Sequence, residues 1–554
     1  MGLSIFVEGK GKNMKWQTKE QLRTLLCRLV EHASISGSEA EVRMAEYIAG
    51  ELQSLDYFQA HPDLVQLHST GDGRYFVTAL VQKAQHVRDT IVLVSHFDVV
   101  DVQDYGAWKE IAFSPETITA RFYEQKEQLP ADVRADLECG EWLFGRGVMD
   151  MKCGLALHMS LIEQACSGRF DGNLLLLTVP DEEVNSAGMR AAVPVLVQMA
   201  KRYGLDYRLV LNSEPMFARY PGDQTKYIYT GSIGKVLPGF YCYGKETHVG
   251  EPLAGLNANW MVAQIINELE LNTDFCEVSG EEVSPPPTNL LQMDLKEDYS
   301  VQIPHRAVTL YNLFLQQKSL DDVTQALVEL ARRAAERIEK KYQEQAARFA
   351  QLERSVPTSI SVKVWTFAEL RQKAVEIVGE EQVKQLEKQV FRDGADQDER
   401  EQTIEFVDQL GMLCKDFAPM IVLFYAPPYY PAVNSSSDPF IQWLVSKLQQ
   451  YVRETYGITL VQQHYFGGIS DLSYVGLQQP PASLQVLAAN MPMWNQGYTL
   501  PIEALAEWNV PVLNVGPVGR DAHQWTERLN VPFAFDIVKD WLVYTIDQVF
   551  AKYQ

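Results

Sequence analysis

The sequence is poor in cysteine, in positive charge and in long apolar runs. Its 554 residues include seven cysteines, an odd number without Cys-x-x-Cys spacing, which argues against a disulfide framework and a thiolate metal site and favours a reducing, cytoplasmic compartment. No apolar run approaches the ~18 residues that a membrane span needs. Lysine and arginine number 49 against 72 acidic residues, for a net charge of −23, so nucleic acid and anionic membranes are not expected as main partners.

Strand and helix patterns alternate in both terminal parts of the chain. Apolar runs at 75–81, 90–95, 174–179 and 207–212 predict buried strands, and helical spacing predicts helices between them. Ser38 and Glu41 have the spacing of a capping box at the start of the second helix. We therefore predict an α/β sheet with helices on both faces. Residues 102–141 are expected to form a charged, helix-poor excursion, and residues 1–13 a loose extension.

The middle of the chain has a different pattern. Strand patterns at 227–243 and 359–367, with helical patterns at 256–269 and 320–353, predict a small α+β sandwich inserted into the larger domain. Residues 368–416 predict mostly charged helix with one break at 393–396, for which a solvated structural face is the natural interpretation.

Three consecutive carboxylates, Asp181, Glu182 and Glu183, follow the strand at 174–179. Ligands in open α/β sheets collect beyond the carboxyl ends of the strands. Adjacent carboxylates at such a place repel one another and lose hydration unless a cation compensates. For this motif alone, a polar loop with solvated acids is the alternative.

Further metal-ligand side chains follow predicted strands or tight turns. Together with Glu183 they are His96, Asp150, Glu214 and His523. Two imidazoles and three carboxylates, with no thiolate, suit two divalent ions that share one carboxylate. Two such ions can hold a bridging water, lower its pKa and polarise a carbonyl group. Glu182, beside a ligand, would then be free to act as the general base.

These segments resemble the motifs of the zinc-dependent aminoacylase and glutamate carboxypeptidase family (metallopeptidase family twenty). The matching segments are H-x-D at 96–98, G-R-G-x-x-D-x-K at 145–152, D-E-E at 181–183, N-S-E-P at 212–215 and G-P…H at 516–523. They stand in the family's order, and the match covers nearly the whole chain apart from residues 1–13 and about 368–416. The length and the extra helical region are most similar to the arginine-utilisation (RocB-like) branch.

The resemblance implies a role for each motif residue. The implied ligands are His96, Asp150 and Glu214 for one metal ion and Asp150, Glu183 and His523 for the other. Zinc is the expected metal, with cobalt or manganese as alternatives. Asp98 would fix the tautomer of His96, and Glu182 would pass a proton from the bridging water to the leaving nitrogen. Glutamate at 214 is similar to carboxypeptidase- and acylase-type members, which act on N-blocked amino acids.

The same resemblance implies the domain arrangement. The catalytic domain, a mixed sheet flanked by helices, would comprise residues 14–225 and 430–554. An inserted α+β sandwich at 226–429, with a helical insert near 368–416, would be the lid and dimerisation domain. His248 resembles the lid histidine that helps to stabilise the oxyanion in the partner subunit's active site, which implies a homodimer. A surface histidine before a helix is the alternative.

The substrate-binding residues are less well defined. Gly467, Gly468 and Asp471 resemble a G-G-x-x-D turn that lines the substrate pocket, although a plain glycine turn is the alternative. Many members carry a lid-strand arginine that grips the substrate carboxylate, whereas here Arg306 precedes the predicted strand at 307–315. Recognition of a free α-carboxylate is therefore in question. The segments 102–141 and 368–416 exceed those of a minimal member and could narrow or cover the cleft.

We therefore expect a cytoplasmic, homodimeric di-metal hydrolase that cleaves an amide bond of a small peptide or N-acyl amino acid, with arginine or amino-acid utilisation as the finer expectation. The alternative is a non-hydrolytic metal-binding or regulatory protein of the same fold. Glu182 alongside all five ligands favours the enzyme, because a non-hydrolytic protein has no structural reason to keep a further acid beside a dication site. A substrate group other than an amide is a third possibility, since fold and metals do not fix the substrate.

Overall fold

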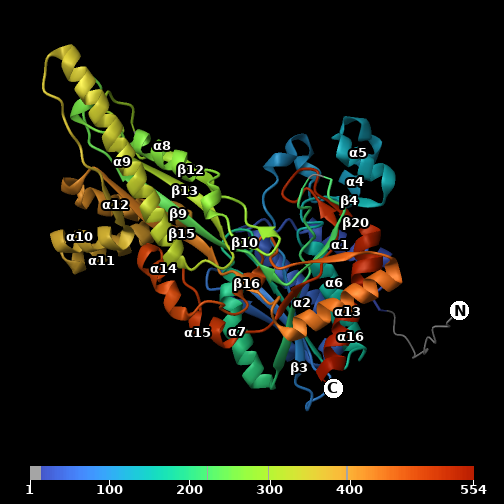
Figure 1. The fold of residues 1–554 in the computed structure, drawn as a ribbon. Helices are drawn as coiled ribbons and strands as arrows, with labels where there is room; N and C mark the ends of the chain where they lie inside the picture. The colour runs from blue at the N-terminus through green and yellow to red at the C-terminus, as the bar shows by residue number, and fades with distance from the viewer. Residues whose placement is uncertain (1–13, 221, 297, 395–396, 554) are drawn as a thin grey trace. The chain divides into compact units, whose positions relative to one another are not determined.

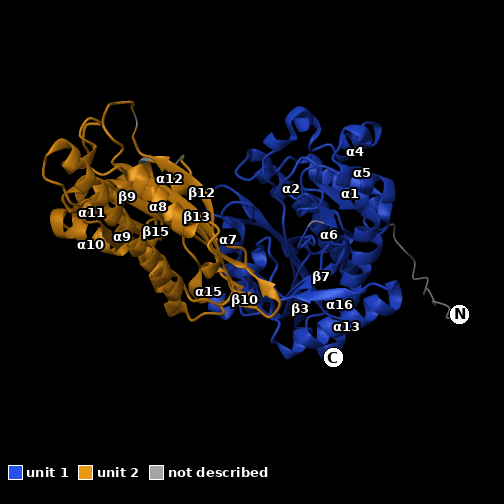
Figure 2. Ribbon diagram, turned by 45° about the horizontal axis from the view of Figure 1, so that its top comes forward, with its two compact units in different colours: residues 1–232, 433–476, 504–554 blue, residues 233–432, 477–503 orange. Residues whose placement is uncertain are grey.

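The structure, a computed structural model, describes residues 14–220, 222–296, 298–394 and 397–553. The predicted extension at 1–13 lies outside these residues. The chain forms two compact units, coloured separately in Figure 2. Unit 1 contains the chain up to residue 232, residues 433–476 and the chain from residue 504 onward, and unit 2 contains residues 233–432 and 477–503. Residues 477–503, which were predicted to belong to the catalytic domain, thus fall in unit 2.

Unit 1 is built on an eight-stranded mixed sheet (Figure 1). In spatial order its strands are β1 (Val65–Ser69), β2 (Tyr75–Val81), β5 (Asn173–Val179), β3 (Asp89–His96), β6 (Asp206–Asn212), β18 (Val512–Asn514), β7 (Lys226–Tyr229) and β17 (Leu460–Gln463). Strands β5, β3, β6 and β18 are parallel, so their carboxyl ends meet at one edge. Every residue of β5 is buried, as its apolar run predicts.

Helices flank this sheet and complete the core of unit 1. Helix α6 (Lys152–Cys166) is almost entirely buried because it packs against β3, β5 and α1 (Lys19–Glu31). The other longer helices of unit 1 are α2 (Glu39–Gln53), α7 (Ala187–Tyr203), α13 (Pro439–Tyr456) and α16 (Lys539–Tyr553); the shorter ones are α3 (Asp56–Ala60) and, at the unit boundary, α15 (Ile502–Glu507). A mixed sheet flanked by helices confirms the predicted fold class.

The predicted capping box at the start of α2 is wrong. Ser38 is the N-cap residue, but its side chain makes no capping hydrogen bond. Glu41 is buried instead, and its carboxylate accepts hydrogen bonds from the backbone N–H groups of Gly37 and Asp181, both at 2.8 Å. A buried carboxylate binds backbone donors wherever the fold presents them, and the Asp181 donor comes from a segment 140 positions away. Glu41 therefore links α2 to the turn of consecutive carboxylates.

The excursion at 102–141 is helical, so the prediction of a helix-poor segment is wrong. It contains a 3₁₀ segment, Gln103–Ile111, and the helices α4 (Pro115–Glu124) and α5 (Ala131–Cys139). The apolar residues of α4 and α5 recur at helical spacing and form a small core with Tyr105 and Phe144. The high charge density of the segment concealed this sparse apolar stripe.

Unit 2 is organised around a five-stranded sheet. In spatial order its strands are β12 (Thr288–Asp294), β13 (Arg306–Leu315), β9 (Gly234–Tyr243), β15 (Met420–Tyr430) and β14 (Lys363–Thr366). The helices α8 (Ala258–Leu269) and α9 (Leu320–Glu353) pack against each other, and α9 has the bounds that its helical pattern predicts. Strand β13 begins at Arg306, which therefore lies on the strand rather than before it.

The helical insert of unit 2 consists of α10 (Phe367–Val378), α11 (Glu380–Asp393) and α12 (Glu399–Leu413). The helical structure is interrupted between α10 and α11 at Gly379, whose φ of +86° suits a residue without a side chain. This interruption was not predicted. Phe367, Leu370 and Phe406 are buried, so the insert contributes to the core of unit 2 and is not only a solvated face. A short helix, α14 (Gln485–Asn490), packs against α10.

Among the described helices, none combines the length and the apolar character that crossing a lipid bilayer requires.

Candidate metal centre and active site

The five predicted ligands come together at the carboxyl edge of the sheet of unit 1. His96 is the last residue of β3, Glu183 lies in the turn between β5 and α7, and Glu214 follows β6. Asp150 lies between β4 (Trp142–Phe144) and α6. His523 lies in the turn between β19 (Gly519–Arg520) and β20 (Arg528–Asn530). Strands β19, β20 and β4 form a three-stranded sheet, which brings the turns that carry Asp150 and His523 to the same place.

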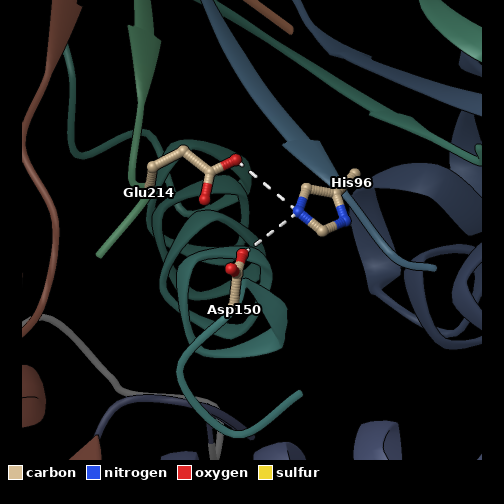
Figure 3. A group of neighbouring side chains, drawn as sticks. All are labelled: His96, Asp150 and Glu214. Atoms are coloured by element: carbon tan, nitrogen blue, oxygen red, sulfur yellow. Dashed lines mark ion pairs between the residues drawn. The ribbon is translucent and has the colours of Figure 1, made fainter. Parts of the chain in front are cut away.

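One group of donor atoms surrounds the imidazole of His96 (Figure 3). Its Nε2 atom lies 3.4 Å from Oδ1 of Asp150 and 3.6 Å from Oε1 of Glu214. His96 and Glu214 are buried, and the side chain of Asp150 is 12% exposed. They come from three segments that the parallel strands and the β4–α6 turn bring together.

A second group surrounds the imidazole of His523. Its Nε2 atom lies 3.4 Å from Oδ2 of Asp150 and 3.1 Å from an oxygen of Glu183. The two oxygens of Asp150 thus face different histidines, as a carboxylate shared by two metal ions would. The His523 side chain is 47% exposed, in contrast to the buried His96.

The spacing of these atoms fits divalent ions. Nitrogen and oxygen donors about 2.0–2.1 Å from a tetrahedral ion lie about 3.3 Å from one another. The separations between the paired donor atoms of the two groups run from 3.1 to 3.6 Å. In each group, the three donor atoms all lie within 4.8 Å of one another. Imidazole and carboxylate donors without thiolate suit zinc, cobalt or manganese.

The electrostatics of the site also favour cations. Burial opposes a charged His523, but hydrogen bonds to Asp150 and Glu183 outweigh this effect and raise its pKa to about 11. Burial raises the pKa of Glu183 and of Glu214. Burial thus disfavours the charged form of these carboxylates, and a divalent cation bound among them would offset that cost.

Asp98 holds both His96 and the turn of consecutive carboxylates. Its Oδ1 lies 3.5 Å from Nδ1 of His96 and accepts the backbone N–H of Glu182 at 3.1 Å, and its Oδ2 accepts the hydroxyl of Ser36 at 2.7 Å. Burial would raise the pKa of Asp98, but its contacts with His96 outweigh burial and lower it. The backbone carbonyl of Asp98 also lies near Nδ1 of His96, at 3.1 Å. These two acceptors at Nδ1 leave Nε2 facing Asp150 and Glu214, and the role of the Asp98 carboxylate in fixing the tautomer stays a prediction.

Glu182 lies beside both donor groups without belonging to either. Its Oε2 lies 3.9 Å from Nε2 of His96. Burial raises its pKa well above the usual value for a glutamate, and neighbouring carboxylates, Glu183 among them, raise it further. Such a carboxylate is a stronger base than a solvated one, which suits proton transfer.

A cavity of about 880 Å³ opens over the donor atoms, within unit 1. Besides the site residues, its lining includes Phe217, Arg219, Phe466 and Arg520. The predicted substrate-binding residues lie at different depths. Gly468 lines the cavity, and Gly467 is exposed beside it. Asp471 is buried, and burial raises its pKa to about 7.

Two predicted residues lie in unit 2. His248 is exposed in the loop between β9 and α8, where its Nδ1 accepts the backbone N–H of Gly250 at 3.1 Å. Arg306 forms an ion pair with Asp408 of α12, which also accepts the hydroxyl of Tyr241 at 2.8 Å. The guanidinium of Arg306 therefore already has a carboxylate partner within unit 2.

Glu527 is a site residue that the sequence did not reveal. Its buried Oε1 accepts the backbone N–H groups of Gly147 and Met149 at 2.8 and 3.2 Å. Its Oε2 accepts a hydrogen bond from Nη1 of Arg146 at 2.9 Å. Glu527 thus fixes the turn that carries Asp150. The consecutive residues Glu527 and Arg528 give no signal in the sequence, because their role depends on the pairing of β20 with β4.

Comparisons with known proteins agree with this geometry. A family model described as peptidase family M20/M25/M40 matches residues 92–506. The proteins YqjN and RocB of Bacillus subtilis (strain 168) are 49% and 30% identical to this chain; the matches cover 96% and 94% of it, and 97% and 93% of the two relatives.

Solved structures share the fold at low sequence identity. The M20 family metallo-carboxypeptidase Sso-CP2 from Sulfolobus solfataricus matches with a TM-score of 0.53 and 13% identity, over 96% of this chain and 99% of that one. The dipeptidase Dug1p from Saccharomyces cerevisiae matches with a TM-score of 0.53 and 12% identity, over 96% of each chain. Because the family model spans most of the sequence, the chain belongs to peptidase family M20/M25/M40 and is a hydrolase of the metallopeptidase type.

Proposed function

We propose that this protein hydrolyses an amide bond in a small peptide or an N-acyl amino acid. The observation that carries the proposal is the position of Glu182. It lines a cavity of about 880 Å³ together with Asp150, Glu183, Glu214 and His523, yet it belongs to neither donor group. A buried carboxylate at such a place is suited to move a proton while other side chains hold the metal ions. The cavity is large enough for a dipeptide-sized substrate.

In the proposed mechanism, the metal ions would be held by the two donor groups, with Asp150 shared between them. When bound, two divalent cations lower the pKa of water and polarise the scissile carbonyl. The carboxylate of Glu182 accepts a proton from water as the water oxygen attacks the carbonyl carbon. The protonated Glu182 then donates that proton to the leaving nitrogen as the carbon–nitrogen bond breaks. Asp98 keeps His96 in the orientation that directs Nε2 towards Asp150 and Glu214.

The test is metal analysis of the purified protein together with an amine-release screen. The screen covers dipeptides and N-acyl amino acids and includes arginine derivatives, because the length and the extra helical region resemble those of the arginine-utilisation branch. We expect about two zinc-like ions per chain and amine release that a chelator abolishes. Full metal occupancy without amine release from any substrate would favour a non-amide substrate or a binding role.

Glu182→Gln separates catalysis from metal binding. Loss of the general base should lower kcat by about 100- to 10,000-fold, while the metal content stays that of the wild type. A simultaneous loss of metal would identify Glu182 as a ligand and overturn its proposed role. Glu503→Gln, at an exposed glutamate on α15, is the control for the substitution itself.

We propose further that the protein is a homodimer in which unit 2 acts as the lid and dimerisation domain. The edge strand β12 supports this, because it carries the exposed apolar side chains of Leu290 and Met293. His248 would then help to stabilise the oxyanion in the partner subunit. His248→Ala should lower kcat, and mixing it with Glu182→Gln should restore activity through hybrid dimers. A mixture that stays inactive at every ratio would remove this role.

The proposed compartment is the cytoplasm. All seven cysteines are free, and Cys27, Cys153, Cys242 and Cys414 are buried as thiols. A chain with this pattern gains nothing from an oxidising environment. Fractionation of the producing cells, followed by immunodetection of the protein, tests this placement.

A further inference from the structure

We propose that Asp136, in the helical excursion 102–141, is a positioning residue for the metal ligand His523. This inference rests on the proposed two-metal site. Asp136 lies on α5 and contacts two arginines, Arg520 and Arg528, which flank the turn that carries His523. The excursion would thus help to build the second metal site and would not merely border the cleft.

The hairpin of β19 and β20 needs an anion where its two strands meet the turn. Arg520 and Arg528 are directly opposite each other in the antiparallel pair, immediately before and after the turn. Like charges at opposed positions destabilise a strand pair. The carboxylate of Asp136 lies between them: its Oδ2 is 3.5 Å from Nε of Arg520 and 2.7 Å from Nη2 of Arg528. One carboxylate therefore contacts the cations at both ends of the turn and reduces their mutual repulsion.

The guanidinium of Arg528 carries this restraint into the turn. It is fully buried, and its Nε donates to Oδ2 of Asp136 at 2.8 Å. On its other side, Nη1 donates to the carboxylate of Asp521 and to the backbone carbonyl of Thr526. The hydroxyl of Thr526 also donates to Asp521, at 2.7 Å. Asp136, Arg528 and Asp521 form a continuous clamp that ends two residues before His523.

The turn depends on such a clamp because its own backbone is strained. Asp521 and His523 have φ values of 60° and 61°, in the left-handed region that side-chain-bearing residues rarely adopt. The side chain of His523 is 47% exposed, so packing does little to hold the ring. Its direction towards Asp150 and Glu183 therefore follows from the conformation of the turn, and the clamp fixes that conformation.

The clamp acts on one donor group only. His96, Asp150 and Glu214 are held by the strand ends, Asp98 and Glu527. Among the described residues, the hydrogen bonds and ion pairs of the Asp136 side chain go to Arg520 and Arg528 and not to this group. Loss of the Asp136 carboxylate should therefore weaken the ion held with His523 and spare the ion held by His96. Residues that orient metal ligands typically change metal affinity about 10- to 100-fold when they are replaced.

The experiment compares Asp136→Asn with wild type by titrating the metal-free full-length protein with Co²⁺. Calorimetry gives the affinity of each ion, and visible absorption reports its coordination. We expect the first ion to bind as in wild type and the second to bind about 10- to 100-fold more weakly. We also expect kcat to fall while KM stays close to wild type. Glu138→Gln, on the same helix with a 60% exposed side chain, is the matched control and should change neither affinity.

Asp136→Glu is a second variant, which keeps the charge and should restore part of the second affinity. It also covers the case in which Asp136→Asn fails to fold. Unchanged affinity for the second ion in Asp136→Asn, or equal weakening of both ions, would overturn the inference while leaving the proposed function intact. Fewer than two ions bound by the wild-type protein would instead overturn the proposed two-metal site, and the inference with it.

Discussion

Replacement of Glu527 by glutamine tests whether the buried Arg146–Glu527 pair supports the turn of Asp150. Both side chains are almost completely buried, with side-chain exposures of 0% for Glu527 and 1% for Arg146. Glutamine keeps an oxygen for the N–H of Gly147 but directs an amide N–H₂ at the guanidinium of Arg146. One donor would then face another, and a buried positive charge would lose its closest anion.

The expected cost follows from this geometry. Removing one partner of a buried ion pair destabilises a protein by about 3–5 kcal/mol, because the remaining charge stays buried without compensation. Arg146 keeps a second carboxylate, Asp104, at 2.8 Å, and the backbone carbonyl of Asp101 at 3.2 Å. The loss should therefore lie at the lower end, at about 3 kcal/mol. Urea unfolding of the metal-free protein measures it without the stabilisation that bound ions add.

Glu39→Gln provides the comparison for Glu527→Gln. Glu39 pairs with Arg43 at 3.4 Å, but its side chain is 94% exposed, so the same substitution should leave the urea midpoint unchanged within error. Equal midpoints for the two variants would refute the assignment of Glu527 as a support of the Asp150 turn. A midpoint shift for Glu527→Gln alone, accompanied by weaker Co²⁺ binding, is the expected result.

Three further predictions concern pH, lid chemistry and metal. Burial lowers the pKa of His158 to about 3, so between pH 6.5 and pH 3 only the unfolded chain binds a proton at this residue. The free energy of unfolding should therefore not depend on this residue above pH 6.5 and should fall below it by about 1.4 kcal/mol per pH unit. In His158→Gln the urea midpoint should fall less between pH 6.5 and 5.0 than in wild type. Because Asp408 occupies its guanidinium, Arg306→Lys should leave KM for N-acyl amino acids unchanged in steady-state assays. Chelation should abolish amine release and lower the melting temperature, and Zn²⁺ or Co²⁺ should restore both.

The clustering of the candidate ligands could be predicted from sequence because each donor lies next to a feature that the sequence displays. His96 and Glu214 end or follow strands whose apolar runs are unbroken, and parallel strands bring their carboxyl ends together without further information. Glu183 belongs to a run of three acids after such a strand. Motif order then connected these segments with Asp150 and His523, which lie in turns and not at the ends of the main sheet.

The supporting residues could not be predicted, because their partners are remote in sequence. Arg146 and Glu527 are 381 positions apart, and Arg528 and Asp136 are 392 apart. A charged residue in a short segment has many possible environments. Only the register of β20 against β4 and β19 buries Glu527 and Arg528. The helices of the excursion were missed for a related reason. Their apolar residues are few and become a core only when Tyr105 and Phe144 complete it.

Strand β20 and the residue before it show how the two halves of the candidate site are joined. Glu527 and Arg528 are consecutive, and successive side chains of an extended segment point to opposite sides. Glu527 accordingly binds the turn of Asp150, while Arg528 binds the turn of His523. The excursion contacts both systems, through Asp104 to Arg146 and through Asp136 to Arg528.

A segment that only covered the cleft would have no need to place carboxylates on both buried arginines. Asp132, on the same helix as Asp136, does line the cavity, so the excursion also narrows it. Narrowing the cavity and supporting the turn of His523 predict different outcomes for exposed and buried positions of α5. Asp132 also lies 3.5 Å from Nη2 of Arg528, but its side chain is 61% exposed and solvent weakens that ion pair. Substitution of Asp132 should therefore alter KM with little effect on metal affinity, whereas substitution of Asp136 should alter metal affinity with little effect on KM. An excursion that acts only as a cover would give the first outcome at both positions.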